Sequence, residues 1–319
     1  MIAPTPFVIC LGLCTLDQTW NVARIPQQPV KVLADGYTTS GGGMAATAAV
    51  TVARLGGRAA FWGRAGQDPT GLLIRAGFEQ EQVDVGALRL FEGAQSPIAA
   101  VLVDADGERL IANFPGANLP DAPHWLPIHQ VGGAQAVLAD MRWISGAIAL
   151  FEAARDRGIP TVLDADFAPT GDFGRILPLT DYALFSSAGL ASYAGNADAV
   201  RALGQARAQG CVVAGVTRGA RGTLWLDARG EHRTPAFAVR TIDTTGAGDV
   251  FHGAYAFCIG TGQSAAQAAR FAAATAALKC RHPGGRQGIP RLEEVEQFLA
   301  AANADAAGER PDTGTVANH

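Results

Sequence analysis

The chain has 319 residues, of which 48% are hydrophobic and 17% charged, and its formal net charge is −4. This composition is typical of a folded protein with a large core, and the acidic balance argues against a broad nucleic-acid surface. Only Lys31 and Lys279 are lysines, and neither follows a glycine, so the Gly-Lys-Ser/Thr loop of P-loop nucleotidases is absent.

The cysteines and the apolar segments indicate the compartment. The five cysteines contain no Cys-x-x-Cys pair, and an odd count fits no disulfide framework. No apolar run approaches the roughly 18 residues of a membrane span, and the N-terminus lacks the basic region of a signal peptide. We therefore expect a cytoplasmic protein with reduced thiols that binds neither membranes nor nucleic acid.

The N-terminal part begins with a short apolar run at residues 7–13, which predicts a buried strand. Residues 22–39 mix apolar side chains with prolines and a glycine, a pattern typical of irregular edge strands. A small-residue helix is expected at 44–55, where Gly56 and Gly57 end it. Further along, the turn sequence Asp104-Ala-Asp-Gly107 joins two strand-like runs and predicts a β-hairpin over 97–114.

Strands and helices alternate through most of the remaining chain. The further expected elements are strands at 59–63, 137–140, 160–166, 182–186 and 211–217, and helices at 70–78, 146–157, 197–209, 250–257, 264–280 and 291–302. Such alternation predicts an α/β fold whose mainly parallel sheet is flanked by helices and binds ligands along one rim. The interrupting β segments, roughly 18–39 and 95–115, would form a small β-sheet lid over that rim. We expect one domain over 1–302 and a flexible tail over 303–319.

The most informative stretch is Asp-Thr-Thr-Gly-Ala-Gly-Asp at 243–249, ahead of a helical run. Its turn would point the N–H groups of Ala247, Gly248 and Asp249 together at a helix N-terminus, which makes an anion site. An acid inside an anion site repels its ligand unless it has a task, and Asp249 could act as general base for a hydroxyl attacking phosphorus. A glycine-rich turn capped by an aspartate is the plain alternative, and Gly-Ala-Gly-Asp alone leaves both open.

The seven-residue string resembles the C-terminal signature of the ribokinase-like (PfkB) carbohydrate kinase family. Residues 40–57 are similar to its N-terminal signature, and residues 12–17 to its first sugar contact. The resemblance extends from about residue 7 to about residue 299. It implies the ribokinase-like fold with a β-lid, use of ATP and Mg²⁺ to phosphorylate a sugar-like alcohol, and a homodimer formed through the lid.

The resemblance also implies roles for individual residues. Asp249 matches the catalytic base, and the backbone of Gly246, Ala247 and Gly248 matches the anion hole. Asp17 would bind sugar hydroxyls beside the backbone of Gly42 and Gly43, although a plain Asx turn is the alternative for Asp17. The expected ATP-binding positions are Thr217, Gly219, Gly222, Gly246 and Gly248. A monovalent cation such as K⁺ would be held by Asp243, Thr245, Gly284 and Gly288.

Two departures from the family pattern stand out. The family usually carries Asn-x-x-Glu after a central strand to organise Mg²⁺ and phosphates, whereas this chain has Ser186-Ser-Ala-Gly189. Acidic support for the metal would then come from Asp164 or Asp166. Ribokinases commonly place an asparagine where Ala46 stands, which argues against ribose as the substrate.

Three segments, at 41–48, 137–143 and 277–290, resemble the sulfofructose kinases of this family, which phosphorylate the 1-hydroxyl of 6-deoxy-6-sulfofructose in sulfoquinovose breakdown. In that group a lysine, an asparagine and an arginine bind the sulfonate, and they match Lys31, Asn113 and Arg142. The chemistry is coherent, because an arginine fork grips two sulfonate oxygens while lysine adds charge and asparagine a directed donor. The alternatives are a solvated lysine, an asparagine in a turn, and an arginine stacked on Trp143.

Other functions stay open at this level. The nearest is a kinase for fructose, fructose 6-phosphate, tagatose 6-phosphate or another sugar, since a phosphate also suits a Lys/Asn/Arg pocket. A sugar-binding regulator without turnover is a non-enzyme alternative. A nicotinamide-dependent oxidoreductase is disfavoured, because Cys10-Leu-Gly-Leu-Cys-Thr15 lacks the Gly-x-Gly-x-x-Gly pattern.

Overall fold

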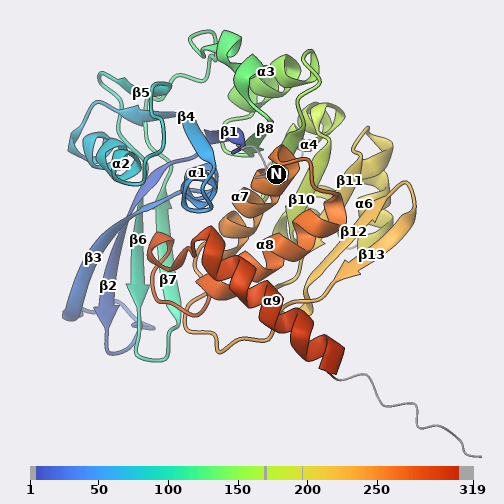
Figure 1. Cartoon of the computed structure of the whole chain (residues 1–319). Helices are drawn as coiled ribbons and strands as arrows, with labels where there is room; N and C mark the ends of the chain where they lie inside the picture. The colour runs from blue at the N-terminus through green and yellow to red at the C-terminus, as the bar shows by residue number, and fades with distance from the viewer. Residues whose placement is uncertain (1–4, 169–170, 196, 309–319) are drawn as a thin grey trace, which may run out of the picture.

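The computed structural model describes residues 5–168, 171–195 and 197–308, and these form two β-sheets with helices around the larger one (Figure 1). The large sheet has nine strands in the order β13-β12-β11-β10-β9-β8-β1-β4-β5. They are β1 (Phe7–Gly12), β4 (Arg58–Gly66), β5 (Leu88–Phe91), β8 (Ala136–Asp140), β9 (Thr161–Ala165), β10 (Tyr182–Ser186), β11 (Val213–Thr217), β12 (Thr223–Asp227) and β13 (Gly230–Thr234). All pair in parallel except β12 and β13, which add an antiparallel hairpin at one edge.

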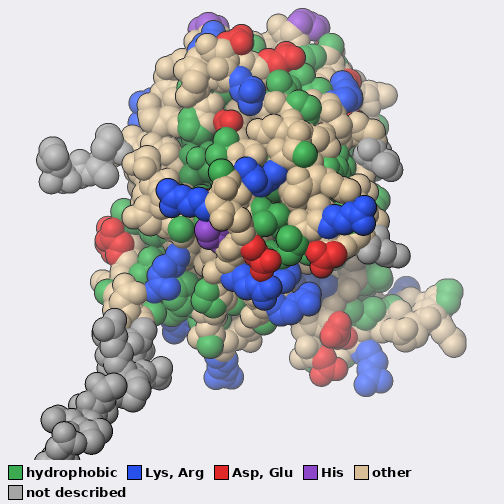
Figure 2. All heavy atoms as spheres, turned by 90° about the vertical axis from the view of Figure 1, so that its right-hand side faces the viewer, with side chains coloured by type: hydrophobic (Ala, Val, Ile, Leu, Met, Phe, Trp, Pro, Cys, Tyr) green, Lys and Arg blue, Asp and Glu red, His purple; other side chains and the backbone are tan. Residues whose placement is uncertain are grey.

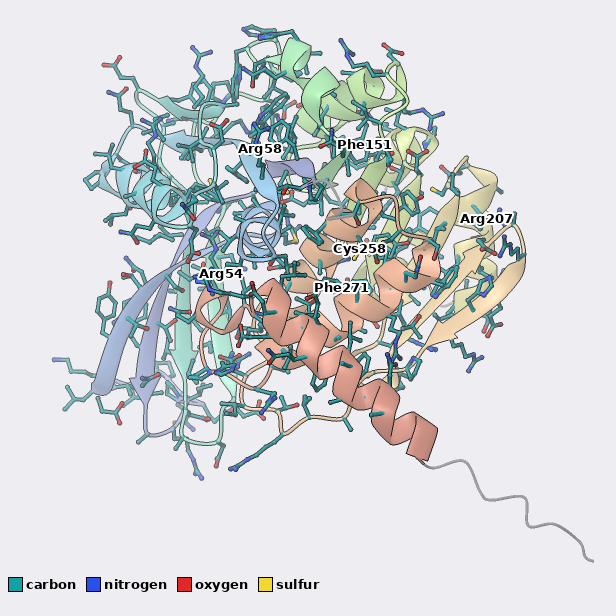
Figure 3. The ribbon with its side chains drawn as sticks, in the orientation of Figure 1. Arg54, Arg58, Phe151, Arg207, Cys258 and Phe271 are labelled. Atoms are coloured by element: carbon teal, nitrogen blue, oxygen red, sulfur yellow. The ribbon has the colours of Figure 1, made fainter. Side chains whose placement is uncertain are left out.

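Helices cover both faces of the large sheet, as a parallel sheet requires. The first face carries α1 (Met44–Arg54), α2 (Pro69–Gln80), α7 (Ala247–Gly260) and α8 (Ala265–Lys279), with α9 (Leu292–Gly308) packed on α8. The second carries α3 (Ile144–Arg155), α4 (Asp172–Ile176), α5 (Ser187–Ala194) and α6 (Ala199–Ala208). Phe271 of α8 and Phe151 of α3, both labelled in Figure 3, lie in these two separate cores.

The small sheet has the order β3-β2-β6-β7 and projects from the rim of the large one (Figure 1). Its strands are β2 (Thr15–Val22), β3 (Ala34–Gly42), β6 (Ile98–Val103) and β7 (Arg109–Phe114). The β6–β7 hairpin is antiparallel, whereas β2 and β6, which are distant in sequence, pair in parallel. The predicted α/β class with a smaller β-sheet is therefore confirmed.

Some boundaries differ from the sequence-based expectation. Helix α7 begins at Ala247 rather than at Val250, because Gly246 turns the chain with a φ of 73°. Helix α9 continues to Gly308 through an alanine-rich stretch of high helix propensity, so residues 303–308 extend it, and 309–319 lie outside the described residues. Strands β5, β12 and β13 and helices α4 and α5 were not predicted.

The surface and the thiols complete the description. On the face drawn in Figure 2, Lys and Arg side chains are interspersed with Asp and Glu rather than gathered in one field. Across the described part of the chain, no helix combines the length and hydropathy of a membrane span. All five cysteines are unpaired, and four of them are buried.

Candidate active site

A cavity of about 980 Å³ lies between the small sheet and the rim of the large sheet. Asp17, Arg142, Asp166 and Asp249 all line it, although they come from four distant segments. Parallel strands place the loops that follow them along one edge, which is why these side chains meet. The cavity is large enough for a sugar together with a phosphate chain.

The small sheet presents rows of side chains to this cavity. Asp17 on β2 lies in register with Ser40 on β3 and Ala99 on β6, and Ala99 in turn with Asn113 on β7. Residues opposite each other in a sheet share a face, and all four line the cavity. A second row on this face holds Thr38, Thr19, Val101 and Ile111. A third row holds Asn21, Val103 and Arg109.

Asp17 is held in place by its neighbours on β2 and β3. Its Oδ1 atom accepts a hydrogen bond of 2.7 Å from the Thr15 hydroxyl. A Cβ at Gly42 would lie 2.2 Å from its Oδ2 atom, so Gly42 leaves room for the carboxylate, while Gly43 lines the cavity. Burial raises the pKa of Asp17, although the Thr15 bond and the charge of Arg286 oppose the shift.

The N-terminus of α7 has the predicted glycine turn, but one of its three amides is already bonded. Gly246 takes the left-handed conformation, and the Ala247 N–H then bonds the Thr244 carbonyl at 3.1 Å. Among the described residues, the N–H groups of Gly248 and Asp249 find no acceptor. The site therefore offers two free amides, not the three that the sequence suggested, with the positive end of the helix dipole behind them.

Asp249 stands among other acids. Burial raises its pKa to about 7, aided by the negative charges of Asp164, Asp140 and Asp166 and opposed by His252. The Nδ1 atom of buried His252 lies 3.0 Å from Oδ2 of Asp164, an ion-pair distance without hydrogen-bond alignment. Burial lowers the pKa of His252, but these carboxylates outweigh that effect and raise it overall. The pKa of Asp249 therefore lies near neutral pH, as a general base would require.

This setting predicts an acid limit on activity. Because Asp249 must be ionised to accept a proton, kcat/KM should fall about tenfold per pH unit below about pH 7. The measurement is a pH profile of initial rates at saturating nucleotide. In Asp164→Asn, which removes the largest neighbouring charge, the acid limb should move to lower pH. A profile that is flat from pH 5 to 8, or a limb that moves upward in this variant, would contradict the assignment.

Asp140, at the end of β8, connects three segments at the rim of the large sheet. Its carboxylate accepts N–H bonds from Leu13 (2.8 Å), Ala45 (3.1 Å) and Arg142 (2.8 Å), and so caps α1 from another strand. Burial raises its pKa to about 6. Gly12 is required beside it, because a Cβ there would lie 2.2 Å from Oδ2.

We expect Asp140→Ala to lower the free energy of unfolding by about 1–3 kcal/mol, because the N–H groups of Leu13, Ala45 and Arg142 lose their acceptor while the cost of burying the carboxylate charge is removed. Urea denaturation at pH 8 measures this loss. The matched control is Asp106→Ala, because Asp106 is exposed in the β6–β7 turn, and it should change stability by less than about 0.5 kcal/mol. Equal effects of the two substitutions would refute this role for Asp140.

The three residues expected to bind a sulfonate are not all brought together. Asn113 and Arg142 line the cavity, whereas Lys31 is exposed in the β2–β3 loop and is not among the lining residues. Arg142 donates to the Phe167 carbonyl at 2.8 Å and to Asp166 at 3.0 Å. The suggested stacking on Trp143 is taken by Arg64 instead, 4.3 Å from the ring centre.

The predicted nucleotide loop lies at the same rim but outside this cavity. Thr217 ends β11, and Gly219 and Gly222 have positive φ angles of 57° and 73°. None of the three lines the cavity, so their role in binding ATP stays a prediction. The Thr217 carbonyl accepts a bond of 3.1 Å from Ser187, which joins this loop to the start of α5.

The residues expected to hold a monovalent cation do not fit that group. Asp243 accepts N–H bonds from Thr245 and Gly284, but its carboxylate also pairs with Arg109 at 2.5 Å. Lys279 donates to the Asp243 carbonyl at 3.0 Å. Gly288 lies apart, where a Cβ would be 2.9 Å from the Lys279 carbonyl oxygen. Fixed cations of the protein already face the oxygens of Asp243.

The acids fit a divalent cation better. Within the described residues, no three His, Cys, Asp or Glu side chains could hold a metal by themselves. Mg²⁺ commonly uses one or two carboxylates and takes its other ligands from phosphates and water. Asp166 lines the cavity and suits such a site, whereas Asp164 does not line the cavity and its Oδ2 atom lies 3.0 Å from Nδ1 of His252.

Sequence reasoning missed several cavity residues, including Thr19, Asn21, Arg64 and Arg109. The polar residues at alternate positions 15, 17, 19 and 21 were an available signal, because a strand with period-two polarity presents one polar face. A second missed contact is that of Arg54 in α1, which bonds the carbonyls of Arg286 (2.7 Å) and Ile289 (3.1 Å) (Figure 3). Arg54 thus anchors the segment from which Pro283, Gly284, Gly285 and Gln287 reach the cavity.

Comparisons with known proteins agree with this geometry. The family model described as pfkB family carbohydrate kinase matches residues 5–292. A ribokinase of Haemophilus influenzae is 26% identical over 92% of this chain and 98% of its own, and a fructokinase of Klebsiella pneumoniae is 35% identical over 66% and 74%. The structure of Arabidopsis thaliana ribokinase complexed with ribose and ATP is similar with a TM-score of 0.82 and 25% identity, covering 92% of this chain and 99% of that one.

Proposed function

Because the chain belongs to the pfkB family of carbohydrate kinases, we propose that it uses ATP to phosphorylate the 1-hydroxyl of 6-deoxy-6-sulfofructose. The observation that carries the kinase part is Asp249 beside two unpaired amides, in a cavity that also contains Asp17. The sulfonated substrate is supported by Arg142 and Asn113 in the same cavity.

In the proposed reaction, Asp17 accepts hydrogen bonds from sugar hydroxyls and fixes the ring. Asp249 takes the proton of the attacking sugar hydroxyl. The hydroxyl oxygen forms a bond to the γ-phosphorus, and the bond from that phosphorus to the bridging oxygen of ADP breaks. The Gly248 and Asp249 amides stabilise the charge on the transferring group. The small sheet covers the site and excludes water.

A Mg²⁺ ion would be held by Asp166 together with the phosphates, and it would neutralise part of the phosphate charge. Asp166 is also bonded by Ser186 at 2.7 Å, so the first residue of the segment that replaces Asn-x-x-Glu orients this acid. We further propose a homodimer formed through the small sheet, since Val30, Leu33, Tyr37 and Leu110 expose large apolar surfaces there.

A kinase for fructose or fructose 6-phosphate is the second candidate, and the 35% identity to a fructokinase favours it. It also needs no help from Lys31, which lies outside the cavity. With sulfofructose or fructose 6-phosphate, Arg142 would have to share its charge between the substrate and Asp166.

The test is to compare kcat/KM for sulfofructose, fructose 6-phosphate, fructose and ribose by ADP release. We expect sulfofructose to be the best substrate, and Arg142→Ala to reduce its kcat/KM about 10–150-fold, the range for one lost charge-assisted bond, but that of fructose less than about threefold. Arg201→Ala, on the exposed side of α6, is the matched control. A higher value for fructose or its phosphate would favour the second candidate, and sugar binding without ADP release would indicate a regulator.

A further inference from the structure

A charged cluster surrounds the first residue of the 243–249 turn. It is made of Asp243, Lys279 and Arg109, and we call it the Asp243 cluster. Lys279 is the last residue of α8, and its side chain is 0% exposed. Its Nζ atom donates to the backbone carbonyl of Asp243 at 3.0 Å and lies 3.7 Å from the carboxylate oxygen Oδ1. Arg109 reaches the same oxygen from β7 of the small sheet. Three segments distant in sequence thus meet on one aspartate.

A fully buried lysine demands an explanation, because an unpaired ammonium in a protein interior is strongly disfavoured. Asp243 supplies the compensation, and its own pKa is lowered against burial by the hydrogen bonds from Thr245 and then by the charges of Lys279 and Arg109. The other titratable group beside the ammonium is the Cys280 thiol, whose pKa burial raises, so it stays neutral. Burial lowers the pKa of Lys279, and the charge of Asp243 opposes that shift. One carboxylate thus faces the Lys279 ammonium and the Arg109 guanidinium, and the cluster carries a net positive charge.

This balance leaves no role for an exchangeable monovalent cation. The carboxylate oxygens of Asp243 already accept from Arg109 and from the N–H groups of Thr245 and Gly284. A bound K⁺ would add a third positive charge within a few ångströms of two others, in a site of low dielectric. The ammonium of Lys279 supplies the charge that such an ion would bring.

The cluster is connected directly to the catalytic turn. The N–H groups of Ile242 and Asp243 both donate to the Cys280 carbonyl, at 2.8 and 3.2 Å, so the end of α8 holds the segment that leads into the turn. Asp243 then fixes Thr245 through its N–H, one residue before Gly246. Lys279 thus acts on the two free amides through Asp243.

We propose that Lys279 is a built-in cation that positions the 243–249 turn, so that phosphoryl transfer in this protein does not depend on K⁺ or any other monovalent cation. The proposal rests on the proposed kinase function, but its structural half, the occupation of the cation position by a side chain, can be measured without turnover. Lys279 is a positioning residue, because it contacts neither sugar nor nucleotide in this arrangement.

The first experiment compares the wild-type protein in potassium chloride and in tetramethylammonium chloride at equal ionic strength. We expect kcat to differ less than twofold and Tm to be the same in both salts. Activation by K⁺ of tenfold or more, together with a rise of Tm on K⁺ titration, would overturn the proposal. The Tm comparison needs no substrate, so an absence of sugar phosphorylation would sink the proposed function and leave this inference intact.

The second experiment uses Lys279→Ala, which removes the charge and leaves space for an ion. In tetramethylammonium chloride we expect kcat of this variant to be about 10–100-fold below that of the wild type, and its Tm to be lower. Added K⁺ should then increase kcat at least fivefold and raise Tm. Lys279→Arg, which keeps a cation, should remain insensitive to K⁺, as should the surface control Arg201→Ala. Unchanged kcat and Tm in Lys279→Ala would refute the positioning role. If that variant does not fold, the wild-type salt comparison still decides the question.

Discussion

Replacing Asp249 with asparagine is expected to lower kcat by about 10²–10⁴-fold, the range that a positioned general base contributes. The substitution keeps the size and shape of the side chain, so the turn that holds Gly246 at a φ of 73° should survive. It removes the carboxylate that lies in the cavity beside the free amides. Nucleotide affinity should stay the same or increase slightly, because a negative charge near the phosphates is lost.

Two measurements separate this effect from misfolding. Calorimetric titration with ADP should give a dissociation constant within about threefold of the wild type, and thermal unfolding should be unchanged or higher, since a buried acid with a raised pKa is removed. Asp156→Asn, at the exposed end of α3, is the matched control and should have wild-type kcat. Turnover by Asp249→Asn within tenfold of the wild type would mean that another group accepts the proton.

The sequence indicated the turn at residues 243–249 because its signal is local. Seven consecutive residues determine the glycine turn, the start of α7 and the position of Asp249, and helix–strand periodicity determines the alternation of the large sheet. The sequence did not predict that the Ala247 amide is already bonded. That depends on a single hydrogen bond of 3.1 Å to the Thr244 carbonyl. A motif does not specify a single hydrogen bond.

Contacts between distant segments were out of reach for a different reason. The parallel pairing of β2 with β6 joins residues about eighty positions apart, and no periodicity encodes which strands become neighbours. The same holds for Asp140, which bonds the loops after β1 and β8 and the start of α1, and for Lys279 beneath Asp243. Lys31 has the residue type expected for sulfonate binding, but its position in the β2–β3 loop leaves it outside the cavity.

Removing the carboxylate of Asp17 should act on sugar binding. On the cavity face of the small sheet, Asp17 lies in one row with Ser40, Ala99 and Asn113. The hydrogen bond from Thr15 and the space left by Gly42 hold its carboxylate there. A carboxylate that accepts two sugar hydroxyls makes two charge-assisted bonds, each worth about 1.5–3 kcal/mol. Asp17→Ala should therefore reduce kcat/KM about 10²–10⁴-fold, with most of the loss in KM for the sugar and little change in KM for ATP.

The same geometry gives a graded series. Gly42→Ala should weaken sugar binding less than Asp17→Ala, because its Cβ would start 2.2 Å from Oδ2 and displace the carboxylate without removing it. Asp35→Ala, on the exposed part of β3, changes an acid of the same sheet outside the cavity and should leave both KM values alone. Steady-state kinetics with sugar and ATP varied in turn measures all three. A loss that falls equally on both substrates would argue that Asp17 supports the sheet rather than the sugar, since only a direct contact is specific for one ligand.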